Sequence, residues 1–95
     1  MRGLRMADTP APHENIVATE FDGGEGVLVD LNSKRYYQLN ETAMLVWRCL
    51  ERGLSAEEIV GEMTGRYDVT PEHAAGSLSK LLHSLHTHKL VGPRP

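Results

Sequence analysis

The chain has 95 residues, enough for one small domain, which excludes an enzyme whose active site lies between two domains. Apolar residues make up 40% of the sequence and charged residues 24%, which is typical of a globular chain and excludes disordered, collagen-like and membrane proteins. The 13 acidic residues outnumber the 10 Lys and Arg residues and leave a formal net charge of -3. Nucleic acid is therefore not the expected partner, because binding it needs a broad positive field.

Cysteine content and the absence of targeting signals predict a cytoplasmic protein. Cys49 is the only cysteine, so an intramolecular disulfide is excluded. No stretch approaches the roughly 20 apolar residues that cross a bilayer. The first residues also lack the apolar segment of a secretory signal, so no membrane contact is expected.

Residues 1–15 are expected to form a flexible tail before the folded domain. They contain two prolines and scattered polar residues without hydrophobic periodicity, and such a segment buries too little apolar surface to offset its ordering entropy. The sequence therefore predicts one domain over residues 16–91, followed by a short C-terminal tail over residues 92–95.

Three short antiparallel strands are predicted between Ile16 and Leu39. The segments IVATEF, VLVD and RYYQL are rich in β-branched and aromatic residues, and the turn-forming segments DGGEG and LNSK separate them. Alternation in the third strand places Tyr37 and Leu39 on the face that packs on helices, with Tyr36 and Gln38 on the other face.

Two helices are predicted after the strands, where the hydrophobic period changes from two to about 3.6 residues. The first runs from about residue 41 to 52, with Asn40 as N-cap and the left-handed Gly53 at its end. The second runs from residue 56 to about 65, because Ser55 and Glu58 match a capping box.

A third, longer helix of about 18 residues follows and supplies most of the core. Thr70 is its N-cap, Pro71 occupies its first position, and it ends near His88. Residues 90 and 91 are expected to return along the surface. Strands followed by helices predict an α+β fold, a winged-helix-like domain in which a three-stranded antiparallel sheet precedes three helices.

A small winged-helix transcription regulator is the alternative that this order of elements raises, because the second and third helices resemble a helix-turn-helix. Charge argues against it. Residues 55–72 contain five acids and one cation, Arg66, and the third helix adds only Lys80 and Lys89. Phosphate contacts require several Lys or Arg residues.

Metal, cofactor and catalytic sites are not expected either. His83, His86 and His88 are close in sequence, but they do not share one helix face in the closed spacing of a zinc site. Cys49 lies beside apolar residues and is interpreted as a core thiol. The glycine-rich DGGEG segment lacks the helix and Lys of a phosphate-binding loop.

The third predicted strand offers a different function, because a terminal strand of a sheet has unpaired N–H and C=O groups on its outer side. RYYQL has cations only at its start, Lys34 and Arg35, so nothing in the strand blocks pairing. An extended peptide could bind there as a fourth strand. The equally weighted alternative is that the N-terminal tail or a second copy in a homodimer covers this edge.

Several segments resemble PqqD-type proteins, the RiPP recognition elements. These segments are Val27–Asp30, the run from Tyr37 to Ala43 with the pattern Y-x-L-N-E-T-A, Trp47, the helix around Glu58, and the closing leucine-rich helix. The likeness covers residues 16–91. The resemblance implies a stand-alone adaptor that binds the leader segment of a ribosomally made precursor peptide. It also implies delivery to a modifying enzyme, either a radical SAM enzyme or a leader peptidase, as in pyrroloquinoline quinone or lasso-peptide maturation.

In proteins of this kind the leader adds as a strand to the third strand, and the third helix lines the groove. Carried onto this chain, the strand contributes Arg35, Tyr36, Tyr37, Gln38 and Leu39, and Lys34 at its entrance helps to steer the peptide. Helical periodicity selects the facing stripe Ser77, Lys80, Leu81, Ser84 and His88. Of these, Tyr37 and Leu39 are expected to serve the core more than the ligand. The alternative for Lys80 is a solvent-exposed side chain that does not contact the ligand.

Overall fold

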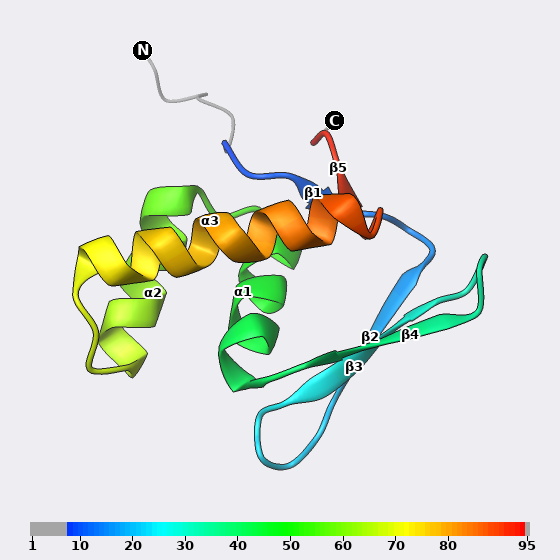
Figure 1. The fold of residues 1–95 in the computed structure, drawn as a ribbon, viewed down its shortest axis with the longest axis horizontal. Helices are drawn as coiled ribbons and strands as arrows, with labels where there is room; N and C mark the ends of the chain where they lie inside the picture. The colour runs from blue at the N-terminus through cyan, green and yellow to red at the C-terminus, as the bar shows by residue number, and fades with distance from the viewer. Residues whose placement is uncertain (1–7, 95) are drawn as a thin grey trace.

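Two small antiparallel sheets and three helices make up residues 8–94, the part of the chain that the computed structural model describes (Figure 1). The elements are β1 (Ala11–Pro12), β2 (Ile16–Glu20), β3 (Gly26–Asp30), β4 (Arg35–Leu39), α1 (Glu41–Glu51), α2 (Ala56–Arg66), α3 (Pro71–Thr87) and β5 (Val91–Gly92). The predicted α+β order of three strands followed by three helices is confirmed. None of the helices in residues 8–94 is long and apolar enough to cross a membrane.

The three-stranded sheet has the order β2-β3-β4, and both connections are hairpins. Leu28 pairs with Tyr37 and Gly26 pairs with Leu39. The even-numbered residues of β3 and the odd-numbered residues of β4 therefore lie on the face that packs on the helices. Leu28 and Leu39 are buried there, whereas Tyr36 on the opposite face is 73% exposed. Gly26 has no room for a side chain, because an added Cβ would meet Met44 and the main chain of Thr19.

The turn between β3 and β4 is built around Asp30. Its carboxylate Oδ1 accepts hydrogen bonds from the side-chain amide of Asn15 at 2.8 Å and from the main-chain N–H of Asn32 at 2.9 Å and Ser33 at 3.3 Å. Chiefly the bond from Asn15, and then those from the turn, hold the pKa of Asp30 below its ordinary value. The bonds favour the ionised carboxylate, which organises the residues that lead into β4.

The predicted helix caps are present in the structure. The Asn40 side chain accepts a hydrogen bond from the N–H of Ala43, and Ser55 forms the reciprocal capping box with Glu58. Thr70 caps α3, with Pro71 at its first position. Because these caps satisfy the first N–H groups of each helix, all three helices begin at the residues that the sequence predicts.

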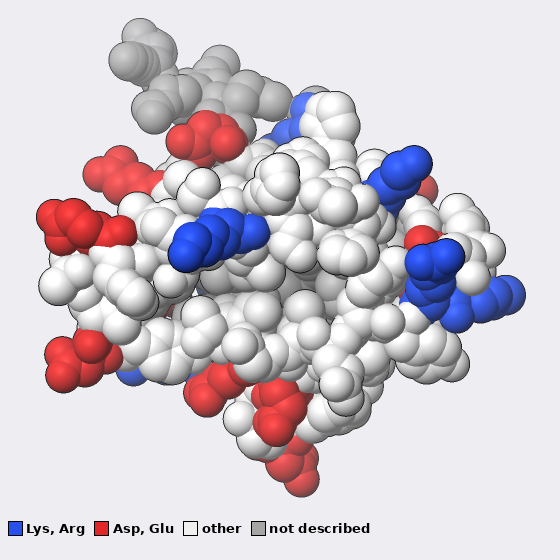
Figure 2. Space-filling view, in the orientation of Figure 1, with Lys and Arg blue, Asp and Glu red and all other residues white. Residues whose placement is uncertain are grey.

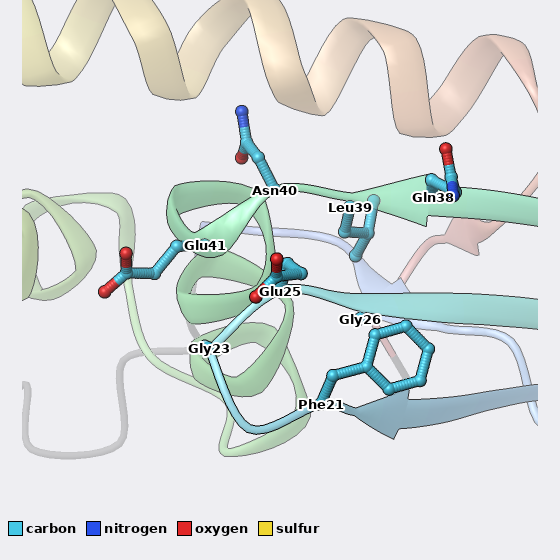
Figure 3. A pocket seen from close by; sticks show the side chains of 8 residues that line it. All are labelled: Phe21, Gly23, Glu25, Gly26, Gln38, Leu39, Asn40 and Glu41. Atoms are coloured by element: carbon cyan, nitrogen blue, oxygen red, sulfur yellow. The ribbon is translucent and has the colours of Figure 1, made fainter.

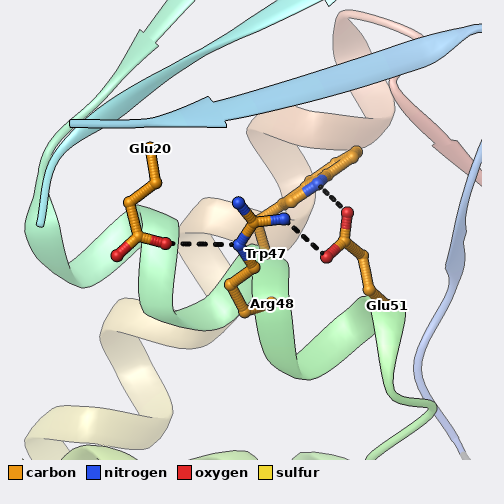
Figure 4. A network of polar contacts seen from close by, with 4 residues as sticks. All are labelled: Glu20, Trp47, Arg48 and Glu51. Atoms are coloured by element: carbon orange, nitrogen blue, oxygen red, sulfur yellow. Dashed lines mark hydrogen bonds and ion pairs between the residues drawn. The ribbon is translucent and has the colours of Figure 1, made fainter.

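Helix α1 lies at the centre of the core. Trp47 and Cys49 on this helix are fully buried, and α3 lies across α1 and α2 (Figure 1). Figure 4 shows the polar contacts that join the helix to the sheet: the guanidinium of Arg48 pairs with Glu20 of β2 at 3.3 Å and with Glu51 at 2.9 Å. The indole N–H of Trp47 donates to the same Glu51 carboxylate at 3.1 Å.

The second sheet corrects the prediction for both ends of the chain. Strand β1 pairs antiparallel with β5, so the described part of the expected N-terminal tail, residues 8–15, belongs to the folded domain. Residues 1–7 and residue 95 of the predicted tails lie outside the described part. Leu90 and Val91, expected on the surface, are buried, because β1 covers them.

One side chain near the C-terminus holds this second sheet in place. The guanidinium of Arg94 donates hydrogen bonds to the carbonyl groups of Thr9, Pro10 and Leu50 and to the Thr9 hydroxyl. The hydroxyl of Thr9, which is only 4% exposed, donates in turn to the carbonyl of Leu54 at 2.7 Å. These bonds link residues far apart in the sequence, so no local pattern predicts them.

Candidate peptide-binding edge

Strand β4 is an edge strand, as the sequence predicts. Within residues 8–94 it pairs only with β3, and β1, which belongs to the expected N-terminal tail, pairs with β5 instead. The sheet thus ends in a row of outward main-chain groups beside α3 (Figure 1). The alternative in which residues 8–15 seal this edge is wrong.

The hydrogen bonds around β2 and β3 determine which β4 residues face outward. The N–H of Phe21 donates to the Glu25 carbonyl at 2.7 Å, and the N–H of Leu31 donates to the Asn15 carbonyl at 2.9 Å. In an antiparallel pair, residues that exchange such bonds alternate with residues that do not. The main-chain N–H and C=O groups of Val27 and Val29 therefore point toward β2. Those of the alternate residues of β3 point toward β4.

Carried through the register of β3 and β4, this alternation assigns both edges of β4. Arg35, Tyr37 and Leu39 bond to β3. The N–H and C=O groups of Tyr36 and Gln38 consequently point to the open side, where an added strand would lie about 4.8 Å away. These two residues carry the ladder groups that a bound peptide would use.

A cavity of about 360 Å³ lies at the turn end of this edge. The β3–β4 hairpin and the C-terminal end of α3 supply its walls, and Tyr37 meets the imidazole of His88 edge-on, with ring centroids 5.3 Å apart. Two permanent cations line it, Arg35 and Lys89. With Asp30 as the acid among the lining residues, this end favours a ligand carboxylate beside an aromatic surface.

A second cavity of about 300 Å³ opens between α1 and α3. Ser77 and Leu81 supply the α3 side. The α1 side comes mainly from Thr42, Ala43 and Val46, which the sequence analysis did not assign to the site. Small and apolar side chains line most of this space, so it fits an inserted aliphatic or aromatic group.

A third cavity, of about 410 Å³, lies at the other end of β4 and is drawn in Figure 3. The side chains of Gln38 in β4 and of Asn40, which follows it, extend to the side on which α3 is drawn, whereas Leu39 points back toward the other strands. Glu25 and Glu41 give this end an acidic lining. The β4 edge therefore has a cationic end near the turn and an acidic end near α1.

Of the other residues of the predicted site, Leu39 lines the third cavity, whereas Lys34, Lys80 and Ser84 lie outside all three. Lys34 is exposed in the turn, with a left-handed φ of 65°. Lys80 and Ser84 are exposed on α3, where the carbonyl of Ser84 is 2.8 Å from His88 Nδ1. Leu39 is 8% exposed and belongs to the core, in line with the expectation that it serves the core more than the ligand.

The described histidines do not gather into a metal-binding group, and the cysteine lies in the core. Within the described residues no three His, Cys, Asp or Glu side chains gather into a group that could hold a metal ion. Cys49 is fully buried, and this burial raises the pKa of its thiol. The thiol therefore packs in the core as a small apolar side chain.

Comparisons with known proteins identify the family and the fold. The family described as coenzyme PQQ synthesis protein D (PqqD) matches residues 25–91. Among solved structures, TbiB1 in complex with the TbiA(beta) leader peptide is 26% identical, with a TM-score of 0.81 over 90% of this chain and 98% of that one.

A second solved structure, a lasso peptide synthetase B1 complexed with the leader peptide, is 30% identical to this chain. Its TM-score is 0.79, and the alignment covers 88% of this chain and 98% of that chain. No curated protein sequence matches significantly. Because the family match spans most of the chain and these structures share its fold nearly end to end, the chain belongs to the PqqD family.

Proposed function

We propose that this protein is a non-catalytic, cytoplasmic adaptor that binds the leader segment of a ribosomally synthesised precursor peptide and delivers it to a modifying enzyme. The observation that carries the proposal is the open edge of β4, where the main-chain groups of Tyr36 and Gln38 face outward beside α3. Two solved relatives of the same fold are complexes with leader peptides, which supports the same ligand class here.

The leader binds as a fourth strand. Its main chain pairs with Tyr36 and Gln38, and alternate side chains then point toward the helices. One apolar side chain enters the cavity that Leu81 and Val46 line. Ladder bonds give general affinity for an extended chain, and the filled cavity selects the sequence.

Charge sets the direction of the bound strand. Arg35 and Lys89 line the cavity near the turn, and Glu25 and Glu41 line the one at the far end of β4. A leader carrying an acid at one end and a cation or polar group at the other matches only one orientation. The expected ligand is therefore an extended segment with a central apolar anchor and an acidic residue near the β3–β4 turn.

The role of the protein after binding is delivery. The described residues offer a binding groove, and the modifying enzyme, a radical SAM enzyme or a leader peptidase, supplies the chemistry. Holding the leader as a strand immobilises one end of the precursor, which raises the effective concentration of the attached core segment at the enzyme.

An NMR titration tests the site. The probe is a synthetic leader peptide from the precursor encoded beside the gene for this chain, added to ¹⁵N-labelled protein. The amides of Tyr36 and Gln38 should shift and become protected from hydrogen exchange, because the added strand bonds to them, and amides near Leu81 should shift as well. Perturbations confined to β2, or no binding at all, would contradict the proposal.

The acidic surface around α2 makes DNA binding a poor second candidate. Acidic side chains gather over the end of the molecule that holds α2 and the start of α3 (Figure 2), where a helix-turn-helix would approach phosphates. A gel-shift experiment on the upstream region of the gene, at low and high salt, separates the two functions. The adaptor predicts no specific shift.

A further inference from the structure

A second groove runs between α2 and α3 and is separate from the β4 edge. It has a volume of about 530 Å³. Its apolar lining consists of Ala56, Val60, Pro71, Ala75, Leu78 and Leu82. We refer to these residues as the α2–α3 groove. An apolar floor with a charged rim is typical of a surface that binds another chain.

The α2–α3 groove and the proposed leader site use different sides of α3. Ala75 and Leu82 line the α2–α3 groove, whereas Ser77 and Leu81 line the cavity beside α1. Leu78 contributes to both and is buried between them. Both spaces can therefore be filled at once without competition for the same surface.

The rim of the α2–α3 groove is acidic. Glu57 and Glu72 line it and are exposed. Next to them, the carboxylate of Asp8 accepts a hydrogen bond from the N–H of Ala56 at 2.8 Å. Arg66 is the single Lys or Arg between residues 55 and 79, and Figure 2 shows acidic side chains gathered over this end.

We propose that the α2–α3 groove docks a segment of the modifying enzyme with an apolar face flanked by Lys or Arg. This inference rests on the proposed adaptor function and names the surface that recognises the second partner. The apolar floor takes the apolar face, and Glu57 and Glu72 pair with the flanking cations. The proposed leader site has two cations, Arg35 and Lys89, at its turn end, whereas the charged residues that line the α2–α3 groove are both acidic.

The separation of the two sites gives the adaptor its mechanism. The leader and the enzyme contact adjoining sides of one helix, so the enzyme can bind the loaded adaptor without displacing the peptide. Both sites share Leu78. The ternary complex then positions the leader at a fixed distance from the enzyme.

The test measures both affinities in the same variants of the full chain. The probes are the purified modifying enzyme or leader peptidase encoded beside the gene and a fluorescent synthetic leader. Ala75→Arg fills the α2–α3 groove and adds a positive charge to its acidic lining. Gly76→Arg is the matched control, because Gly76 is exposed, lies outside both cavities and has open space where a side chain would go.

Ala75→Arg should weaken binding to the enzyme at least about tenfold, and Gly76→Arg should change it by less than about twofold. Both variants should bind the leader as the unchanged protein does. Glu72→Lys should weaken enzyme binding about threefold at low salt, with little effect in about 0.5 M NaCl, where screening removes the attraction.

Three results would overturn the proposal. The first is unchanged enzyme affinity in Ala75→Arg. The second is an effect of Ala75→Arg that disappears once residues 1–7 are deleted, which would assign the groove to the chain's own Arg2, Leu4 and Arg5. The third is a homodimer in sedimentation that Ala75→Arg dissociates. Failure of the unchanged protein to bind the leader would overturn the adaptor function instead.

Discussion

The two edge strands of the same sheet, β2 and β4, differ in what lies beside them. The same alternation of hydrogen bonds places the main-chain groups of three β2 residues on the outer side of that strand: Ile16, Ala18 and Glu20. On β4 the main-chain groups of Tyr36 and Gln38 point outward in the same way. On β2 the N–H of Ile16 already donates to the carbonyl of His13 at 3.2 Å, and the Glu20 side chain is paired with Arg48. On β4 the outward groups lie beside α3 and the cavities.

This difference shows that a selective peptide-binding site needs side-chain cavities in addition to an unpaired strand edge. Main-chain groups on any edge strand can pair with an extended chain, and such pairing carries little sequence selectivity. Strand β4 adds a wall of helical side chains, with Leu81 and His88 at separate cavities. Selectivity therefore comes from the helices, and the edge supplies general affinity for an extended chain.

The largest expected effect comes from closing the β4 edge while keeping its bonds to β3. Gln38→Pro removes an outward N–H and places a ring in the path of an added strand, a position at which an edge strand tolerates proline. Gln38 would make two ladder bonds to the leader, one through its N–H and one through its C=O. Their loss costs about 2 kcal/mol, so leader affinity should fall at least about thirtyfold. Isothermal titration calorimetry with the synthetic leader measures the change.

Ala18→Pro is the matched control for this change, because Ala18 faces outward from the other edge of the sheet. It should leave leader affinity within about twofold while lowering thermal stability by an amount similar to that of Gln38→Pro. If both prolines weaken leader binding equally, the loss arises from general damage to the sheet and the assignment of the β4 edge is wrong.

A smaller effect is expected from the helical wall. Leu81→Ser removes much of the apolar surface that lines the α1–α3 cavity. Loss of one anchored apolar contact costs about 1.5 kcal/mol, or tenfold in leader affinity. Leu45→Ser controls for stability, since Leu45 is also half-buried and lines none of the cavities described. Equal losses in the two variants would argue against a binding role for Leu81.

Local chemistry predicts the main elements of this fold well. Asn40, Ser55 and Thr70 cap the helices as expected, because a cap depends on a few neighbouring residues. Alternation of side chains likewise predicts that Leu39 is buried and Tyr36 exposed. These features follow from short segments, so one sequence is sufficient to predict them.

The features that the sequence analysis missed depend on contacts between distant segments. β1 and β5 have two residues each, too few for a hydrophobic pattern, and they pair across nearly the whole chain. The same reason applies to the binding site. Periodicity selects the α3 stripe that contains Leu81, but the opposite wall at Val46 depends on how α1 packs, which no local spacing encodes.

A modest effect is expected from the cationic end of β4. Arg35→Gln should lower leader affinity about threefold, mainly through slower association, because an exposed charge acts by steering. Surface plasmon resonance at about 50 and 500 mM NaCl separates this effect, which should disappear at high salt. Arg66→Gln removes a charge from the far end of α2 and should change nothing. A loss of affinity that persists at high salt would indicate a direct, desolvated contact instead.

The smallest expected effect concerns the turn that leads into β4. The pKa of Asp30 is lowered, first by the hydrogen bond from Asn15 and then by those from the turn. Asn15→Ala should therefore raise this pKa toward its ordinary value. Asn32→Ala should not, because Asn32 donates through its main chain. An NMR titration of the Asp30 carboxyl carbon measures both.

The sign of the linked stability follows from the same bonds. A carboxyl whose pKa is lowered by folding stabilises the fold when ionised, above its ordinary pKa. That contribution is lost as the pH falls through the lowered value, so the turn should loosen in acid and Asn15→Ala should flatten this pH dependence. The β2–β3 turn does not depend on the Asp30 carboxylate. Acid should therefore affect the amides of Asn32 and Ser33 before those of residues 22–24. The reverse order would mean that Asp30 does not hold the start of β4.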